Sequence, residues 1–256
     1  MFDTHMHCTF SVDSKMLIEE ALQAAKKQNI GIVITEHMDI DYPTNPQSFL
    51  FDVPEYFKAF SPYRSDKLLL GIEIGLQTGC HAANSSIVKG APFDMVIGSI
   101  HVAGGVDVYM EGYYKGRSKR EAYDIYWQDM LACVRDYQDY DTLGHIDYIS
   151  RYATYLDTNL DIAEAEHWAE ICQHLIDNGK ALEINTRRLD EKTAVSSLQP
   201  FYALYKDLGG KYVTLGSDAH RPNEVGRRIV QAYDWAESLG LLPVYFKERE
   251  LVQDKR

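Results

Sequence analysis

Short apolar segments recur along this 256-residue chain, and a longer stretch with helical periodicity separates each from the next. Strands that alternate with helices in this way form βα units, and their strands run parallel in one sheet. The alternation therefore predicts an α/β fold. The expected strands are Phe2–His5, Gly31–Thr35, Leu68–Glu73, Met95–Ile100, Thr142–Ile146, Ala181–Asn185 and Tyr212–Ser217.

The stretches between these strands place apolar residues on one helix face, which predicts helices near residues 17–25, 123–137, 161–178 and 222–240. No Gly/Ser-rich or Pro-rich linker interrupts the chain, so residues 1–256 are expected to form a single domain, a barrel or distorted barrel. Two long loops, Met38–Asp52 and His101–Arg117, are of the kind that is often functional. The charged segment Lys247–Arg256 is expected to be a frayed tail or a short helix.

Composition excludes several classes of protein. Lys and Arg total 26 against 38 Asp and Glu, a formal net charge of −12, and a nucleic-acid surface needs the opposite sign. No apolar run approaches the roughly 18 residues of a membrane span. The four cysteines form no C-x-x-C pair and the N-terminus shows no signal-peptide pattern, so a cytoplasmic location is expected.

Histidine position is the most informative feature, because active sites of parallel α/β proteins gather at the carboxyl ends of the strands. A lone histidine there is more often structural, but six converging imidazoles are hard to explain without a metal cluster. Imidazole suits Zn, Fe and Mn, and carboxylates can bridge two cations. His167 and His174 share a helix face and are expected at the surface, whereas the role of His81 stays open. Six of the nine histidines follow expected strands: His5, His7, His37, His101, His145 and His220.

The combined pattern D-x-H-x-H…EH…E…GS-x-H…GH-x-D…SD-x-H, from Asp3 to His220, resembles the polymerase-and-histidinol-phosphatase (PHP) family. The resemblance implies a single-domain, distorted (β/α)7 barrel of the TIM type, with a metal site at the C-terminal ends of the strands. It also implies two to three divalent ions (Zn, Fe or Mn) and hydrolysis of phosphate esters.

The resemblance assigns roles to individual residues. His5 and His7 match ligands of a first metal, Glu73 a carboxylate that bridges the first and second metals, and Asp218 a shared aspartate. His101 and His145 match second-metal ligands, and His37 and His220 match third-metal ligands. Asp13 stands where many members have histidine, and it is read as a third-metal ligand, with a helix cap as the alternative. Asp3 and Asp147 are expected to orient metal-bound histidines, with a surface position as the alternative for Asp147.

A phosphate ester also needs fixed cations, and arginine matches phosphate bidentately. Arg151 follows the fifth expected strand, while Arg187 and Arg188 follow the sixth, and one of that pair is expected to face inward. Surface positions are the alternative for all three. Glu111, or next Asp107, in the long aromatic loop is a candidate to meet a substrate ammonium, with a solvated side chain as the alternative. Phe10, Phe49, Tyr113 and Tyr114 are candidates to pack on an imidazole or to form the core of a lid.

Within the family, the chain looks most like single-domain members that hydrolyse L-histidinol phosphate to L-histidinol and phosphate in histidine biosynthesis. The expected reaction is in-line attack on phosphorus by a metal-activated hydroxide, with Glu73 and Asp218 as catalytic residues. The alternatives are a PHP phosphoesterase for a nucleotide or phosphotyrosine, and a non-catalytic PHP module. The expected partner is a small phosphate ester, without nucleic acid or membrane, and the oligomeric state stays open.

Overall fold

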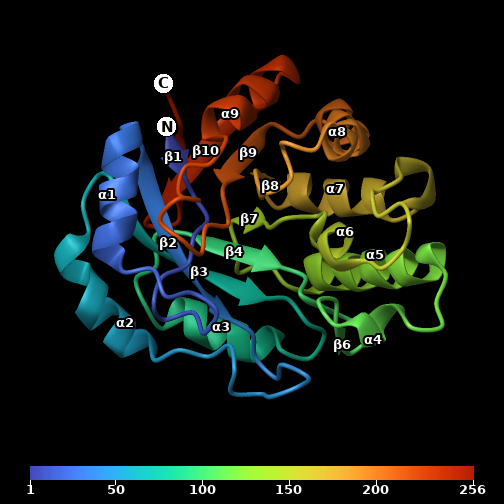
Figure 1. Cartoon of the computed structure of the whole chain (residues 1–256), viewed down its shortest axis with the longest axis horizontal. Helices are drawn as coiled ribbons and strands as arrows, with labels where there is room; N and C mark the ends of the chain where they lie inside the picture. Colours follow the sequence, from blue (N-terminus) through green and yellow to red (C-terminus); the bar gives the residue numbers. More distant parts are fainter.

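One nine-stranded sheet organises this computed structural model, which describes residues 1–256 (Figure 1). Neighbouring strands follow the order β1-β2-β3-β4-β7-β8-β9-β10-β11, and only the last pair is antiparallel. The fold is therefore mixed α/β, as the alternation predicts. The strands are β1 (Phe2–Asp3), β2 (Gly31–Met38), β3 (Leu68–Gly75), β4 (Val96–Ser99), β7 (Thr142–Leu143), β8 (Ala181–Asn185), β9 (Tyr212–Gly216), β10 (Leu242–Lys247) and β11 (Glu250–Gln253).

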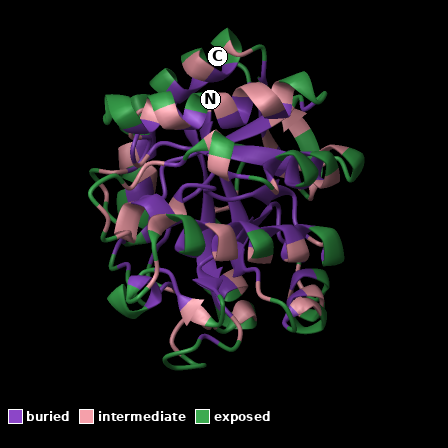
Figure 2. Ribbon diagram, turned by 90° about the vertical axis from the view of Figure 1, so that its right-hand side faces the viewer, coloured by how far each residue is buried: buried purple, intermediate pink, exposed green.

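Helices surround the sheet, with buried strands inside and exposed outer helix faces, as Figure 2 shows. The expected apolar stripes are buried, for example Tyr123, Trp127 and Val134 of α5. No helix is long and apolar enough to cross a membrane. The helices are α1 (Ile18–Gln28), α2 (Val53–Phe60), α3 (His81–Lys89), α4 (Glu111–Tyr114), α5 (Lys119–Asp136), α6 (Tyr148–Tyr152), α7 (Trp168–Asp177), α8 (Lys192–Asp207) and α9 (Ile229–Ser238), with 3₁₀ turns η1 (Ser61–Tyr63) and η2 (Ile162–Glu164).

Two expected helices begin later than the pattern indicates. The stretch near 222–240 becomes helical only at Ile229, because Gly226 (φ 70°) and Arg228 (φ 57°) hold left-handed backbone that a right-handed helix cannot include. The stretch near 161–178 is split into η2 and α7, which begins at Trp168. The long loop after β4 is also more ordered than expected, since it contains the hairpin β5 (Val102–Ala103) and β6 (Val106–Asp107) and then α4.

The chain after β1 is hydrogen-bonded on both sides, because the Thr35 N–H of β2 donates to the Met6 carbonyl at 2.8 Å while neighbouring residues bond to the end of β9. β1 pairs with β2 through Phe2 and Asp3, and the segment that follows is bonded to the chain at the end of β9. The first strand's continuation and the carboxyl end of β9 thus lie side by side, which brings the H-x-H and D-x-H motifs together. Backbone hydrogen bonds of 2.8 Å join Thr4 to Leu215, Asp218 to His5, and His7 to Ala219.

The expectation for the C-terminal segment is wrong. Residues that follow Lys247 form β11, which pairs with β10, and the backbone N–H of Phe2 donates to the Asp254 carboxylate at 2.8 Å. The turn residues Glu248 (φ 53°) and Arg249 (φ 67°) adopt the left-handed backbone of a tight hairpin. This hairpin covers the amino ends of the strands, where Phe2 stacks on Tyr245 with ring centroids 4.0 Å apart.

Candidate metal centre

Along one face of the strands, which we call the inner face, the side chains change from apolar at the amino end to polar at the carboxyl end. Residues two apart in a strand share a face. Val33, Thr35 and His37 therefore lie along the inner face of β2, and Leu69, Gly71 and Glu73 along that of β3. Each series begins in an apolar cluster at the amino end and finishes in a polar group at the carboxyl end. The fold thus places ligating side chains of separate strands at one edge.

The carboxyl edge is crowded enough to require small residues. A Cβ on Gly216 would lie 2.2 Å from Oε1 of Glu183 and 2.5 Å from the His5 side chain, so only glycine fits there. The candidate ligands that converge there are mostly buried: His5, His7, His37, Glu73, His101, His145 and Asp218 are 9% exposed or less, and only His220 and Asp13 are more exposed.

The first group of possible ligand atoms consists of Nε2 of His5, Nε2 of His7, and the carboxylates of Glu73 and Asp218. The two ring nitrogens are 3.1 Å apart. Glu73 oxygens lie 3.3 Å from His5 and 3.5 Å from His7, and Oδ1 of Asp218 lies 3.9 and 3.5 Å from the same rings. Four ligands at zinc bond lengths of roughly 2.0–2.2 Å stand about 3.3–3.6 Å apart in a tetrahedron. The set fits a divalent cation.

Glu73 joins this group to a second one. Its Oε1 lies 2.9 Å from Nε2 of His145 and 3.4 Å from Nε2 of His101. Its Oε2 lies 2.7 Å from Nδ1 of His37. One carboxylate therefore faces five imidazoles, the position expected of a bridging ligand.

Asp13 belongs to a third group, with His37 and His220. Its Oδ2 lies 3.2 Å from Nε2 of His220 and 3.5 Å from Nε2 of His37. The helix-cap alternative is wrong, because α1 begins at Ile18 and Leu17 occupies its N-cap position. His7 completes the cluster, since its ring stacks on His37 and His220 at centroid distances of 3.9 and 4.4 Å.

Carboxylates behind the rings fix the orientation of two histidines. Nδ1 of His5 donates to Glu183 at 2.7 Å, and Nδ1 of His101 donates to Asp39 at 2.8 Å. Each bond leaves Nε2 with its lone pair directed at the centre, the arrangement found behind metal-bound histidines. Sequence reasoning missed both carboxylates, although Glu183 lies within an expected strand and Asp39 follows His37 by two residues.

The two aspartates expected in this orienting role do something else. Asp3 accepts hydrogen bonds from the backbone N–H of Ser217 at 2.8 Å and of Gly226 at 2.7 Å. It therefore holds the loop that carries Asp218 and His220 rather than a histidine ring. Asp147 is buried and lies 3.6 Å from Nη1 of Arg188, so the surface alternative is also wrong for it.

The surroundings shift the pKa values of two adjacent rings in opposite directions. Burial lowers the pKa of His5, but the Glu183 and Glu73 carboxylates raise it well above its usual range. Burial together with the His37 and His220 rings holds the pKa of His7 well below its usual range. A divalent cation would bind both rings, because metal ions replace protons on such ligands.

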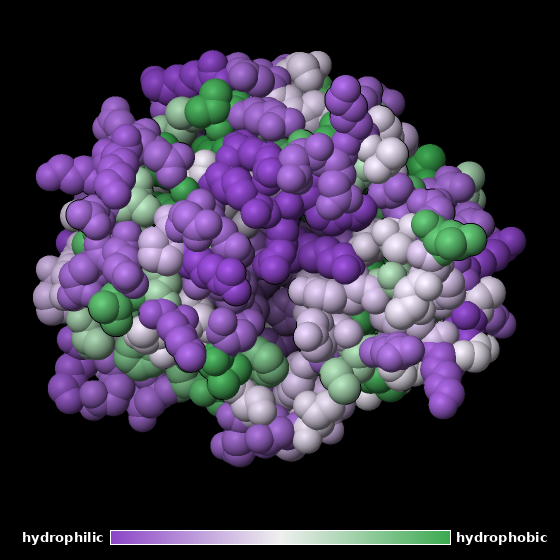
Figure 3. Space-filling view, viewed as in Figure 1, coloured by the Kyte–Doolittle hydropathy of each residue, from purple (hydrophilic) through white to green (hydrophobic).

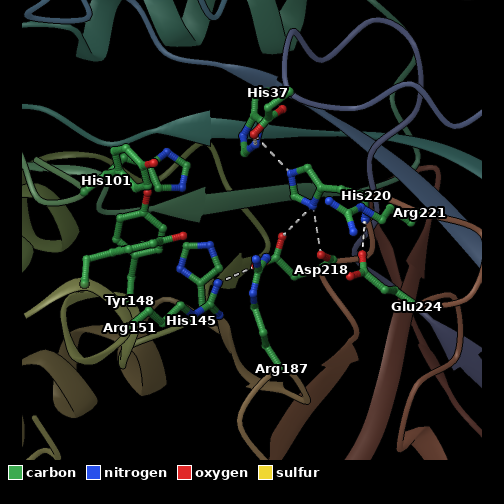
Figure 4. A pocket seen from close by; sticks show the side chains of 13 residues that line it. His37, His101, His145, Tyr148, Arg151, Arg187, Asp218, His220, Arg221 and Glu224 are labelled. Carbon is green, nitrogen blue, oxygen red and sulfur yellow. Dashed lines mark hydrogen bonds and ion pairs between the residues drawn. The ribbon is translucent and has the colours of Figure 1, made fainter.

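The cavity over this centre has a volume of 560 Å³, and Figure 3 shows a hollow near the middle of this face of the molecule, with hydrophilic residues above it. Arg151 and Arg187 both line it, and both approach Asp218, Arg151 at 2.5 Å and Arg187 at 3.7 Å (Figure 4). Burial raises the pKa of Asp218, but Arg151 holds it well below its usual range. Arg188 does not line this cavity and pairs with Glu191 at 3.1 Å instead.

A second cavity of 460 Å³ adjoins the first, and His37, His101 and Tyr148 line both. Phe49 and Tyr109 line the second cavity, as does Asp107, whose carboxylate accepts from the Tyr42 hydroxyl. Other sequence candidates lie elsewhere. Tyr113 and Tyr114 are in the buried core, Phe10 packs against Phe51, Tyr56 and Phe60, and Glu111 is exposed and lines neither cavity.

Comparison with known protein families matches residues 3–187, well over half of the chain, to the PHP domain. The chain belongs to the PHP family. A probable histidinol-phosphatase of Clostridium acetobutylicum is 45% identical over 250 residues, 97% of this PHP chain and 98% of that protein. The histidinol-phosphatase of Lactococcus lactis is 34% identical over 227 residues, 85% of this chain and 83% of that protein.

Two solved structures resemble this PHP chain over most of its length. The histidinol phosphate phosphatase of Lactococcus lactis, crystallised with zinc, L-histidinol and phosphate, matches with a TM-score of 0.92 at 32% identity and covers 99% of this chain and 98% of that one. A Listeria monocytogenes structure matches with a TM-score of 0.76 at 18% identity, which supports the fold alone; it covers 90% of this chain and 99% of that one.

Proposed function

We propose that this chain hydrolyses L-histidinol phosphate to L-histidinol and phosphate. The observation that carries the proposal is the likeness, over nearly the whole chain, to a solved structure that contains zinc, L-histidinol and phosphate. The geometry agrees with it, because histidines and carboxylates that suit metal ions lie beside two arginines and a partly aromatic cavity.

The donor set has room for two to three divalent ions, with zinc favoured by the solved relative and Fe or Mn also compatible with mixed imidazole and carboxylate ligands. A first ion would use His5, His7, Glu73 and Asp218. A second would share Glu73 with His101 and His145, and a third would use Asp13, His37 and His220. When bound, the ions would supply an activated oxygen nucleophile and neutralise charge on the phosphate.

Protein groups would do the remaining work at the phosphate. Arg187 is partly exposed to the cavity and is free to pair with a phosphate oxygen, since its nearest carboxylate, Asp218, is 3.7 Å away. Arg151 is buried against Asp218 and fixes that carboxylate with Oδ2 toward the arginine and Oδ1 toward His7. Asp218 is thereby held beside the reacting centre as a charged carboxylate that would accept a hydrogen bond from the attacking water, with Glu73 holding the metal positions.

The second cavity suits the organic part of the substrate. Phe49, Tyr109 and Tyr148 offer ring surfaces to an imidazole, while Asp107 supplies a carboxylate. Tyr42 already donates to that carboxylate, so Asp107 can bind an ammonium only through its remaining lone pairs. Hydrolysis leaves the alcohol in this cavity and phosphate between the metal ligands and Arg187.

We also propose that residues 1–256 form one domain and that its sheet is a distorted (β/α)7 barrel. The hydrogen bonds between the segments that follow β1 and end β9 support this, because they join the first strand to a strand far along the sheet. The partner would be a small molecule and not nucleic acid, which the net charge of −12 disfavours.

A substrate panel on zinc-loaded protein tests the proposed function. Histidinol phosphate should be hydrolysed with a kcat/KM at least about tenfold above that of nucleoside monophosphates and phosphotyrosine, a difference of about 1.4 kcal/mol in transition-state binding. Equal rates on all three would leave a phosphoesterase of another specificity. No hydrolysis of any, with metal bound, would point to a non-catalytic PHP module.

A further inference from the structure

A third cavity of 460 Å³ lies beside the phosphate position, and arginines dominate its lining. Arg151 and Arg187 line both this cavity and the one over the metal ligands. Arg188 and Arg227 line only this cavity. Four guanidinium groups thus gather on one side of the centre. The single carboxylate in the lining is that of Glu191, half of whose side chain is exposed.

This cavity is positive in a chain that is strongly negative. Its lining holds four arginines and one glutamate, in a sequence of net charge −12. Outside the lining, Asp218 pairs with Arg151 at 2.5 Å and Asp147 lies 3.6 Å from Arg188, but no carboxylate forms an ion pair with Arg227. Like charges in contact repel, so such a cluster costs stability unless an anion offsets it. Burial and the neighbouring Arg228 and Arg187 lower the pKa of Arg227, while Glu224 and Asp190 raise it.

Hydrogen-bond donors remain free on three of these arginines, since the buried Nε and Nη2 of Arg151 have no partner. Nη2 of Arg227 donates to the backbone carbonyl of Arg187 at 2.8 Å, and the buried Nε of Arg227 has no partner. The Arg187 guanidinium makes no hydrogen bond within the protein, and the carboxylate that it approaches, Asp218, is 3.7 Å away. By contrast, Arg188 is already held by Asn159 at 2.9 Å and Glu191 at 3.1 Å. Arg151 is already fixed by Asp218 at 2.5 Å, so Arg187 and Arg227 are the arginines most available to a ligand, while Arg188 is held in place by its two partners.

We propose that this cavity is a second oxyanion site, for a phosphate-sized anion, adjoining the phosphate position at the metal ligands. The proposal rests on the proposed function, since that function places a phosphate next to Arg187. Arginine forks recognise tetrahedral oxyanions through paired N–H donors, and Arg187 stands between the two positions. The anion can be the product, which moves over from the metal ligands, or phosphate from solution.

Phosphate binding to the zinc-loaded protein tests the site. Inorganic phosphate, titrated by calorimetry, should bind at two sites per chain. Arg227→Gln should weaken the second site at least tenfold and leave kcat within about twofold of the unaltered protein. Arg228→Gln is the matched control, because Arg228 is the next residue, pairs with Asp190 at 2.5 Å and does not line the cavity. It should bind both phosphates.

A substitution that is expected to strengthen phosphate binding separates loss of the site from damage to the fold. Glu191→Gln removes the one negative charge in the lining but keeps an oxygen that accepts from Arg188. It should tighten the second site about threefold. One phosphate per chain in the unaltered protein, or two undiminished sites in Arg227→Gln, would overturn the proposal. Equal weakening by Arg227→Gln and Arg228→Gln would also overturn it, because that result indicates general charge rather than a site.

Release of product separates the two sources of the anion. In a single turnover followed with a fluorescent phosphate sensor, a release rate altered at least threefold by Arg227→Gln identifies the product as an occupant. An unchanged release rate, with the second binding event lost, identifies phosphate from solution. Both outcomes support the site. Failure to hydrolyse histidinol phosphate would instead refute the proposed function, and the phosphate stoichiometry is measured without reference to it.

Discussion

The two ends of the inner face differ in almost every physical property, although the same strands build both. At the amino end, eight buried apolar residues pack together, among them Val33, Leu69 and Phe246. At the carboxyl end, the same strands present His37 and Glu73. Apolar packing needs only the protein's own side chains, whereas converging imidazoles and carboxylates form a set that suits a cation. The amino end therefore supplies packing, and the carboxyl end gathers the candidate ligands.

The largest expected effect is at the carboxyl end, with Glu73→Gln. The amide has the shape of the carboxylate but lacks the charge that faces five histidine rings. We expect kcat/KM to fall by about 10³-fold or more, or roughly 4 kcal/mol, with loss of bound zinc. Steady-state kinetics and metal analysis check this. Retained zinc with full activity would contradict the bridging role.

Phe246→Ala makes the corresponding change at the amino end. The ring is 4% exposed and belongs to the apolar cluster, so its removal leaves a cavity. The free energy of unfolding should fall by about 3–5 kcal/mol. Denaturant unfolding of the zinc-loaded protein measures it. Because the cluster lies at the opposite end of the strands from the candidate ligands, kcat per folded molecule should stay within about twofold of the unaltered protein. A larger change in kcat would show that the two ends do not act independently.

The sequence predicts these two ends unequally. Ligands such as His37, Glu73 and His101 lie in or just after apolar strands, so their place at one edge follows from strand direction alone. The cover at the amino end depends on contacts between distant residues, Phe2 with Asp254 and with Tyr245. Its turn, at Glu248 and Arg249, lacks the Asn-Gly or Asp-Gly signal of a tight hairpin. Local pattern therefore predicts which candidate ligands share one edge of the sheet, and it misses the hairpin.

The same limit applies within the site. Arg187 and Arg188 are adjacent and chemically equal in the sequence, but the first lines the metal cavity and the second pairs with Glu191 and Asp147. Likewise, Glu183 rather than Asp3 orients His5. Which side chain turns inward depends on the local backbone and on partners far along the chain. The spacing of residues in the sequence contains neither kind of information.

A smaller effect is expected from the carboxylates behind the rings. Glu183→Gln keeps an oxygen that accepts from Nδ1 of His5, and Asp39→Asn does the same for His101, but both remove the charge that makes each ring a strong ligand. Zinc affinity should fall about 10–100-fold for each. Competition with a chelator measures it. An affinity equal to that of the unaltered protein would show that these carboxylates serve only packing. The contrast between the two ends would then rest on the imidazole rings and not on the carboxylates behind them.

The smallest effect is expected at Glu111, outside both regions. Its side chain is exposed at the start of α4 and lines neither cavity, so a substrate ammonium in the second cavity would meet Asp107 instead. An exposed carboxylate is strongly screened by water and salt. Glu111→Gln should therefore change KM for histidinol phosphate by less than about twofold, measured at low and at physiological ionic strength. A tenfold rise in KM that persists in salt would mean that the first turn of α4 moves over the cavity when substrate binds. The molecule would then have a mobile region in addition to the two ends of the strands.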